Sequence, residues 1–346
     1  MAVSNALHDA IRRLARRESL PLDRAADAFR AIMQGDGTPA LIAALLAALR
    51  VKGESPDEVA GAAMALRGAM TRLEVAGAAD LVDTCGTGGG AVGTFNISTA
   101  SAIVAAGAGV RIAKHGNRSF TTRSGSADVL EALGVAIDLP VERMADVLDA
   151  AGIVFMFAPT MHPAMRHVGP VRRELGIETV MNMVGPLANP AGAGRQVIGV
   201  SDPARAELMA GALARLGTTH SLVVHGEPGM DEVSPVGSTS VIEIRAHAVD
   251  RWTVEPGAFG ITGVTVGDLA GGGPEANAAL IVQILEGRGP VGATAAVTLN
   301  AAAAIYVSGV SPSLEAAMAA ARDAIQGGAA HAALERLRRA ARRPAR

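Results

Sequence analysis

The sequence predicts an α/β protein with a small N-terminal helical domain and a large α/β domain, whose mostly parallel central sheet is covered by helices. Residues 1–72 read as helices only, whereas strands and helices alternate from residue 81 onward, as in a parallel sheet with helices on both faces. The chain has 346 residues, which is long enough for two domains. We therefore expect a helical domain at 1–72, joined by part of 160–190, and an α/β domain at 73–346.

Four helices are expected in the N-terminal domain, at residues 6–17, 23–33, 39–51 and 56–69. The fourth has a clear start signal, because Ser55, a proline at the first helical position and Glu58 form the capping-box pattern. The third is apolar on almost every side, and such a helix is normally buried in a core or against another subunit.

The α/β domain begins with a glycine-rich turn. Residues 81–85 predict a short buried strand, and the run Gly-Thr-Gly-Gly-Gly at 86–90 follows it. Glycines let the backbone turn sharply, so that successive N–H groups can converge on one anion. Taken alone, such a turn more often only connects a strand to a helix.

Further polar loops follow within the same α/β unit. The run Asn-Ile-Ser-Thr at 96–99 precedes an alanine-rich helix expected at 100–108, and the N-terminus of a helix favours anionic ligands. Lys114 ends a second strand expected at 110–113. Open α/β sheets bind ligands at strand ends of this kind, so the loops together predict a site for a phosphorylated sugar.

The glycine spacing also matches a dinucleotide-binding fingerprint, as Gly88-x-Gly90-x-x-Gly93. That fingerprint needs an acidic residue roughly 20 residues further on, whereas the second strand offers Lys114 and His115. The sequence has no Gly-x-x-x-x-Gly-Lys-Ser/Thr run either, so a P-loop nucleotide hydrolase has no support.

Longer motifs occur in a fixed order along the chain. Residues 83–134 contain Cys-Gly-Thr-Gly-Gly, Thr-Phe-Asn-Ile-Ser-Thr, Lys-His-Gly-Asn-Arg and Ser-Gly-Ser-Ala-Asp-Val-Leu-Glu-Ala-Leu-Gly. His-Pro-Ala-Met-Arg (162–166), Gly-Pro-Leu-Ala-Asn-Pro (185–190), Met-Asp-Glu-Val (230–233) and Asn-Ala-Ala-Ala (300–303) follow. Over essentially its whole length the sequence resembles the anthranilate phosphoribosyltransferase family, which transfers the phosphoribosyl group of 5-phosphoribosyl 1-pyrophosphate (PRPP) to the amine of anthranilate in tryptophan biosynthesis.

The resemblance implies roles for individual residues. Those that match PRPP-binding positions are Gly86, Gly89, Gly90, Thr94, Asn96, Ile97, Ser98, Thr99, Lys114, His115, Gly116, Asn117, Arg118, Ser119, Phe120, Thr121, Thr122 and Ser126. Ser98, Asp231 and Glu232 match the ligands of Mg²⁺, of which we expect two per subunit. Gly86, Asn117 and Arg172 match positions that contact anthranilate. The resemblance also implies a homodimer formed through the helical domain.

Some of these roles also make chemical sense without the family. Asp231 and Glu232 are adjacent carboxylates in a loop after a strand expected at 221–225, and Mg²⁺ prefers a few carboxylates completed by water and substrate phosphates. As a pair alone, they would more often be solvated loop charges. Arg172 stands beside Arg173, and a planar guanidinium suits an aromatic carboxylate, although either arginine could simply face solvent.

The reaction implied is displacement of pyrophosphate by an arylamine. Such an amine is already neutral at pH 7, so positioning and electrostatic stabilisation can supply most of the catalysis. We therefore expect no distinct catalytic acid or base. His115, the one histidine of the phosphate-loop cluster, is assigned a positional role.

Composition excludes several other classes of protein. The net charge of −2 and the pI near 6.5 leave no bulk basicity for nucleic acid. The N-terminus lacks a basic region followed by a long apolar stretch, and apolar windows elsewhere are expected to be interrupted by charge or to fall short of about 18 residues, so no export and no membrane span are predicted. The single cysteine, Cys85, is expected to be a small core residue in a reducing cytoplasm. Zinc-ligand clusters with the usual spacing are missing.

The chain departs from the family pattern at three positions. Gly90 stands where the family usually has Asp, Glu178 where it usually has Arg, and Met161 where it often has Tyr. We expect weaker magnesium binding as a consequence. Three alternatives stay open: a transferase for a substituted aminobenzoate, a pyrimidine nucleoside phosphorylase of the same superfamily, and a non-enzymatic nucleic-acid-binding relative.

Overall fold

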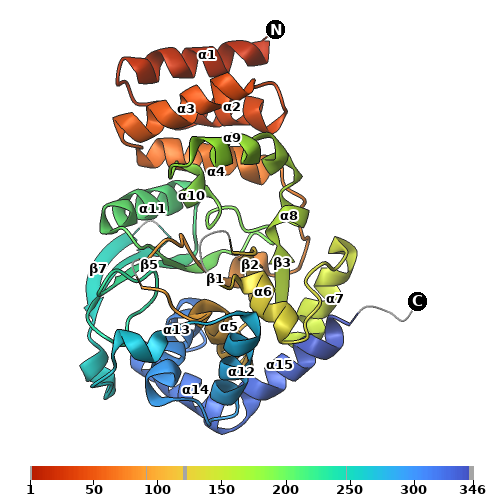
Figure 1. Ribbon diagram of the computed structural model, residues 1–346, viewed down its shortest axis with the longest axis vertical. Coiled ribbons are helices and arrows are strands. Elements are labelled where there is room, and N and C mark those ends of the chain that lie inside the picture. Colours follow the sequence, from red (N-terminus) through yellow and green to blue (C-terminus); the bar gives the residue numbers. More distant parts are fainter. Residues whose placement is uncertain (1, 91, 120–122, 247, 343–346) are drawn as a thin grey trace.

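The computed structural model describes residues 2–90, 92–119, 123–246 and 248–342. A stack of N-terminal helices lies on one side of a central sheet, and the C-terminal helices lie on the other side (Figure 1). The expected fold class, a helical domain followed by a larger α/β domain with a mostly parallel sheet, is confirmed.

Four helices begin the chain: α1 (Ala2–Ala15), α2 (Leu22–Met33), α3 (Pro39–Lys52) and α4 (Pro56–Gly68). The capping box at α4 is confirmed, since the Ser55 N–H donates to Glu58 (2.7 Å) and the Glu58 N–H donates to the Ser55 hydroxyl (3.3 Å). Helix α1 lies earlier than expected and ends before Arg17, whose φ of 61° is not helical.

Short segments from the middle of the chain pack against these N-terminal helices. They are η2 (Pro163–His167), α9 (Gly169–Leu175) and α10 (Met181–Val184), and α8 (Ala158–Met161) precedes them and contacts η2. Segment η2 contacts α2, α9 contacts α3, and α10 contacts α4. Residues between 163 and 184 therefore lie beside the helical bundle, although strands flank them in the sequence.

The sheet has seven strands in the order β3-β2-β1-β4-β5-β6-β7. Their bounds are β1 Val82–Gly86, β2 Ile112–Gly116, β3 Ile153–Phe157, β4 Arg195–Gly199, β5 His220–Gly226, β6 Thr239–Arg245 and β7 Ala248–Val254. Strands β1 to β5 are parallel, and β6 and β7 add an antiparallel edge.

Side chains alternate between two apolar cores across this sheet. Val197 of β4 and Leu222 of β5 belong to the core shared with the C-terminal helices. Their neighbours Ile198 and Val223 belong to the core shared with the N-terminal bundle. This period of two is the mark of strands that are buried on both faces.

The remaining helices cover the two faces. They are α5 (Ile97–Gly107), α6 (Ser126–Ala132), α7 (Val141–Ala151), α11 (Pro203–Leu216), α12 (Pro274–Leu285), α13 (Val291–Ser308), α14 (Leu314–Gln326) and α15 (Ala329–Ala340), with short turns η1 (Ala78–Asp80), η3 (Pro256–Phe259) and η4 (Val266–Leu269). Helix α11 packs on α4, β5 and β6, whereas α13 packs on α5 and α14.

Helix α13 corrects one expectation from the sequence. Its 18 residues are long and apolar enough to cross a membrane by length and composition, so the expectation that every apolar window would be interrupted by charge or fall short of about 18 residues was wrong. It is 72% buried within the protein, and the core helix of a large domain passes the same test.

The strand order reverses between β1 and β4. From β1 the chain continues to β2 on one side, whereas β4 lies on the other side of β1 and leads on to β5. The loops after β1 and β4 therefore meet at the carboxyl edge of the sheet. In open α/β sheets such a switch point is where ligands bind.

Two element boundaries near this edge, and the burial of one residue, differ from expectation. Lys114 and His115 lie within β2 (Ile112–Gly116) instead of following it, because β2 pairs with β3 along its full length. Helix α5 begins at Ile97, so Ser98 and Thr99 form its first turn instead of preceding it. Cys85 is half-buried instead of a core residue.

Candidate active site at the switch point of the sheet

The glycine loop after β1 lies directly against the loop that carries Asp231. The Gly88 N–H donates to Asp231 Oδ2 at 2.9 Å. A Cβ atom at Gly86 would lie 2.5 Å from the same carboxylate oxygen, and a Cβ at Gly199 would lie 1.7 Å from the Asp231 carbonyl oxygen. Only glycine fits at 199, where the clash is with backbone, whereas a side chain at 86 would displace the Asp231 carboxylate. The close approach of the two loops therefore depends on both glycines.

Two more glycines of the loop adopt backbone conformations that favour glycine. Gly88 and Gly89 have φ values of +69° and +77°, in the left-handed region. The loop is fixed from the neighbouring strand end, since the Ser201 hydroxyl donates to the Gly88 carbonyl (2.9 Å) and the Thr87 N–H donates to the Gly199 carbonyl (2.9 Å).

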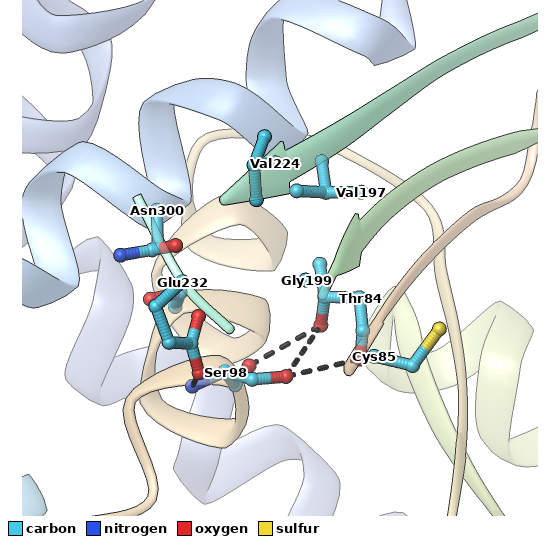
Figure 2. A pocket seen from close by; sticks show the side chains of 9 residues that line it. Thr84, Cys85, Ser98, Val197, Gly199, Val224, Glu232 and Asn300 are labelled. Carbon is cyan, nitrogen blue, oxygen red and sulfur yellow. Dashed lines mark hydrogen bonds between the residues drawn. The ribbon is translucent and has the colours of Figure 1, made fainter. Parts of the chain in front are cut away.

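Glu232 reaches the N-terminus of α5. Its Oε1 accepts a hydrogen bond from the Ser98 N–H at 3.2 Å (Figure 2). Burial first, and the neighbouring Asp231 second, raise the pKa of the Glu232 carboxyl to about 8. Burial also raises the pKa of Asp231. Two desolvated carboxylates side by side favour a cation between or beside them.

The acidic loop is anchored to α13 by Asn300. Its side chain accepts from the Val233 N–H (2.8 Å) and donates to the Val233 carbonyl (2.9 Å). Asn300 stands in a sequence landmark, yet sequence reasoning gave it no role. Its side chain, together with Glu232, Ser98 and Thr84, borders a cavity of about 10 Å³ below the loops (Figure 2), enough for about one water molecule.

Lys114 lies under the first turn of α5. Its Nζ donates to the Thr84 carbonyl (2.5 Å) and to the Ser98 hydroxyl (2.8 Å), and the residue is almost fully buried. Burial lowers the pKa of Lys114, and the nearby Asp83 opposes that shift. The ammonium therefore holds the strand end and the helix start together and adds positive charge at the base of the site.

Asp83 is a buried residue that sequence reasoning missed. Its carboxylate accepts from the His115 N–H (3.1 Å) and from the Asn189 amide (2.8 Å). It thereby joins β1, β2 and the loop before β4. The only sequence signal was a charged residue at an inward position of an otherwise apolar strand.

The loop after β2 folds back on the start of α6. A Cβ at Gly116 would lie 2.2 Å from the Ser126 hydroxyl, which donates to the Asn117 carbonyl at 3.2 Å. Arg118 pairs with Asp128 (2.9 Å) and with Glu131 (2.6 Å). The Ser119 N–H also donates to Asp128, at 3.1 Å. Phe120, Thr121 and Thr122, which the resemblance places in the same loop, lie outside the described residues.

The residues between the glycine loop and α5 belong to a hydrogen-bonded frame. The Asn96 amide donates to the Ser124 carbonyl (3.0 Å), and its oxygen accepts from Asn277 (2.9 Å). Thr94 forms an isolated bridge with residue 270. Ile97 and Thr99 are buried. These residues position the N-terminus of α5.

A pair of histidines lies beside this edge, which the sequence analysis did not foresee. His115 of β2 and His162 after β3 approach with their Nε2 atoms 3.1 Å apart. Burial lowers the pKa of His115 to about 3 and that of His162 to about 4. His115 is thus not the only histidine of the cluster. Because β2 and β3 are neighbours, the segments at their carboxyl ends meet.

Arg172 lies on α9, on the side of the helical bundle. Its guanidinium donates to the Asn182 side chain at 3.2 Å, and burial lowers the pKa of Arg172. It forms no ion pair with the described carboxylates. Arg173 beside it is exposed. Of the two arginines, the structure makes Arg172 the desolvated one.

The three residues that depart from the family pattern, Gly90, Glu178 and Met161, differ in their surroundings. A Cβ at Gly90 would lie 3.6 Å from Asp231 Oδ1, so an aspartate there would face the acidic pair. Glu178 comes within 3.4 Å of a Cβ built at Gly89 and pairs with Arg205 (2.8 Å). Met161 is fully buried.

The described residues contain no group of three or more His, Cys, Asp or Glu side chains arranged to hold a metal. The acidic pair and the Ser98 hydroxyl can therefore supply only part of a coordination shell. This partial set fits Mg²⁺, which keeps several waters and binds substrate phosphates.

The fold and the site define a glycosyl transferase with a separate helical bundle. Residues 8–70 match the model of the helical bundle domain of the glycosyl transferase family, and residues 78–331 match the model of its a/b domain.

Comparison with known proteins narrows this class. The chain is 49% identical over 337 residues to an anthranilate phosphoribosyltransferase of Rubrobacter xylanophilus, covering 97% of this chain and 98% of the relative. The crystal structure of the Thermus thermophilus enzyme matches with a TM-score of 0.91 at 44% identity, over 97% of this chain and 100% of that one. The Saccharomyces cerevisiae enzyme, solved in complex with PRPP and Mg, matches with a TM-score of 0.87 at 27% identity, over 97% of each chain. The chain belongs to the anthranilate phosphoribosyltransferase family.

Proposed function

We propose that this protein transfers the 5-phosphoribosyl group of PRPP to the amine of anthranilate and releases pyrophosphate, as an enzyme of tryptophan biosynthesis. One observation carries the proposal: the glycine loop and the start of α5 both donate backbone N–H groups to the acidic pair, Asp231 and Glu232. N–H donors that suit a pyrophosphate and carboxylates that suit its metal thus meet at one strand edge.

The donor site comprises the glycine loop, the start of α5 and the loop after β2. We assign PRPP to Gly86, Gly89, Gly90, Thr94, Asn96, Ile97, Ser98, Thr99, Lys114, His115, Gly116, Asn117, Arg118, Ser119 and Ser126, together with Phe120, Thr121 and Thr122 outside the described residues. Support comes from the burial of the Lys114 ammonium under α5. The ion pairs of Arg118 with Asp128 and Glu131 favour backbone donation from this loop over a direct arginine–phosphate contact.

We assign two Mg²⁺ per subunit to Asp231, Glu232 and Ser98, completed by water and PRPP. When bound, Mg²⁺ neutralises the charge that develops on the departing pyrophosphate. The support is the raised pKa of both carboxyls, which burial leaves without a full counter-charge. A yeast relative has been solved in complex with PRPP and Mg, which supports the use of Mg²⁺.

The acceptor site comprises Gly86, Asn117 and Arg172. Arg172 is desolvated and pairs with no described carboxylate, so its guanidinium can form two parallel hydrogen bonds to the carboxylate of anthranilate. The neutral ring pair His115–His162 lies at the same edge and adds no charge that would compete with that bond.

The chemistry needs orientation more than proton transfer. The amine nitrogen bonds to the anomeric carbon, the bond from that carbon to the pyrophosphate oxygen breaks, and the amine then loses one proton. Because the arylamine is neutral at the start, no residue has to remove a proton before the bond forms. Lys114 and the N-terminus of α5 stabilise negative charge, while Arg172 fixes the acceptor.

A substituted aminobenzoate is the second candidate acceptor. Glu178 stands close to Gly89 and is held by Arg205, so a carboxylate borders the glycine loop where relatives usually carry an arginine. A cationic or hydrogen-bond-donating ring substituent would suit it.

We also propose a homodimer formed through the helical domain, and a cytoplasmic location. For the dimer the support is α3, whose Val51 is 77% exposed and whose Leu41, Ala43 and Ala47 are only half-buried. A light-scattering mass near one protomer at micromolar concentration would contradict the dimer.

For the cytoplasmic location the support is Cys85, a free thiol, which suits a reducing compartment.

The activity is tested by the loss of anthranilate fluorescence in the presence of PRPP and Mg²⁺. We expect rapid, magnesium-dependent loss with the native protein, a loss of most of the rate in Arg172→Ala, and little change in the matched control Arg173→Ala. No loss of anthranilate fluorescence, with PRPP still bound by calorimetry, would shift the acceptor to another aminobenzoate. No binding of either substrate would refute the transferase.

A further inference from the structure

A second polar cavity lies away from the switch point, between the helical bundle and the amino edge of the sheet. Its lining includes Arg67 of α4, Asn189 and Gln196 around the start of β4, and Thr218 before β5. Because the glycine loop follows the carboxyl ends of the strands, this cavity lies at the opposite edge of the sheet. None of the proposed substrate contacts involves it.

Arg67 is the charged group of this cavity, and it lacks a counter-ion. Its Nε donates to the Leu187 carbonyl at 2.7 Å. The two terminal nitrogens of its guanidinium have no hydrogen-bond partner within the described part of the chain, and no described carboxylate forms an ion pair with them. Burial lowers the pKa of Arg67, and the like charge of Arg72 lowers it further.

The other polar side chains of the lining are already occupied by the fold. Asn189 donates to Asp83 (2.8 Å) and to the residue 113 carbonyl (2.9 Å). Gln196 donates to the Pro186 carbonyl (2.8 Å), and Thr218 donates to the Gly194 carbonyl (3.0 Å). A partly desolvated guanidinium with a free planar edge is thus surrounded by neutral, satisfied groups. Planar forks of this kind bind carboxylates and phosphates with two parallel hydrogen bonds.

The size of the cavity limits what can bind there. Its volume is about 70 Å³, and one water needs roughly 10–15 Å³ on this measure, so it has room for about five to seven waters. Inorganic phosphate and acetate are of this size, whereas a nucleotide or a peptide is not.

We propose that this cavity is a binding site for a small oxyanion, with Arg67 as its anchor and Arg72 as a second positive charge nearby. An occupant would join the helical bundle, through α4, to the loop before β4. The site does not depend on the proposed transferase activity, and its test involves neither substrate.

The first experiment locates the anion in the native protein. Crystals soaked in sodium selenate, a phosphate analogue with an anomalous signal, are expected to show an anomalous peak within hydrogen-bond distance of the Arg67 guanidinium. The absence of a peak there, while selenate occupies the phosphate loops at the switch point, would overturn the proposal.

The second experiment measures binding in solution by calorimetry, with inorganic phosphate and acetate as separate probes and without PRPP. Beside any binding at the phosphate loops of the switch point, we expect a second saturable site. Arg67→Gln should weaken this site more than tenfold and Arg72→Gln should weaken it less, whereas the matched control Arg30→Gln, an exposed arginine of α2, should leave it unchanged. Arg67→Lys keeps the charge without the planar fork and is expected to bind more weakly than the native protein.

The two probes separate the possible sources of the anion. Arg67-dependent binding of phosphate alone would identify a tetrahedral anion, and Arg67-dependent binding of acetate alone would identify a carboxylate; either supports the site. Identical isotherms for native protein and Arg67→Gln, with both folded by circular dichroism, would refute it.

Discussion

A methyl group at Gly86 is predicted to separate the glycine loop from Asp231, the carboxylate that we propose as a metal ligand. The new Cβ would lie 2.5 Å from Asp231 Oδ2, whereas ordinary contact begins at 3.4 Å, so the carboxylate must move by about 0.9 Å (3.4 minus 2.5). That shift breaks its 2.9 Å hydrogen bond from Gly88. A hydrogen bond to a charged group is worth about 1.5–3 kcal/mol, which corresponds to roughly ten- to a hundredfold in affinity.

We therefore expect Gly86→Ala to raise the Mg²⁺ concentration needed for half-maximal activity and the KM for PRPP by about that factor. The matched control is Gly93→Ala, since a Cβ at Gly93 meets nothing within 4 Å and its φ lies outside the left-handed region. Because the clash is with a movable side chain, the free energy of unfolding should fall by only about 1–3 kcal/mol, and the protein should stay folded. Unchanged magnesium and PRPP dependence in Gly86→Ala would refute the proposed coupling of the two loops.

Three further predictions concern the same edge of the sheet. Gly90→Asp should strengthen magnesium binding, because the new carboxylate would face Asp231; a calorimetric titration that gives the native affinity would contradict this. The His115–His162 pair has pKa values lowered to about 3 and about 4, so the folded rings stay neutral at a pH where the unfolded chain takes up protons. The free energy of unfolding should therefore fall as the pH drops below about 6.5, by on the order of 2 kcal/mol per ring at pH 5. Ring carbon NMR shifts that report protonation of the folded protein at pH 6 would exclude this effect. Asn300→Ala should release the acidic loop from α13 and lower PRPP affinity about tenfold, because each hydrogen bond of Asn300 is worth about 1 kcal/mol. Unchanged PRPP binding with native stability would show that this anchor does not contribute to PRPP affinity.

The overall architecture was predictable because it depends on local signals. The capping box at Ser55 and Glu58 fixes the start of α4 within the chain itself, and the alternation of apolar runs after residue 81 requires a covered parallel sheet. The boundaries were less predictable. Lys114 is a long cation in a five-residue strand, and only its contacts with Thr84 and Ser98 explain why it tolerates burial there.

Contacts between distant segments could not be derived from the sequence. His115 and His162 meet because β2 and β3 are neighbours, and neither of the sequence motifs that contain these histidines indicates the strand order. Asn300 approaches the acidic loop only because α13 covers that end of the sheet. A Cβ atom at Gly86 or Gly199 would clash with Asp231. Residue 231 is over a hundred residues from Gly86 in the sequence and about thirty from Gly199, so neither clash could be foreseen from the local sequence.

Residue type was a good guide where the chemistry is specific, and a poor one for exposed charges. Asp231 lies at the glycine loop and Glu232 lies at the start of α5, and their role as metal ligands stays a prediction. Arg118, by contrast, carries the charge expected of a phosphate ligand, yet it is held by Asp128 and Glu131. An arginine side chain reaches far enough that its partner depends on the tertiary structure.

The most direct test of the account is a calorimetric titration of PRPP into the native protein and into Glu232→Gln, with and without Mg²⁺. If the glycine loop and the acidic pair form one donor site, PRPP will bind the native protein far more tightly with Mg²⁺ than without it, and the variant will lose most of that difference. Equal PRPP affinity in the presence and absence of Mg²⁺, or an unchanged magnesium effect in Glu232→Gln, would contradict the central claim.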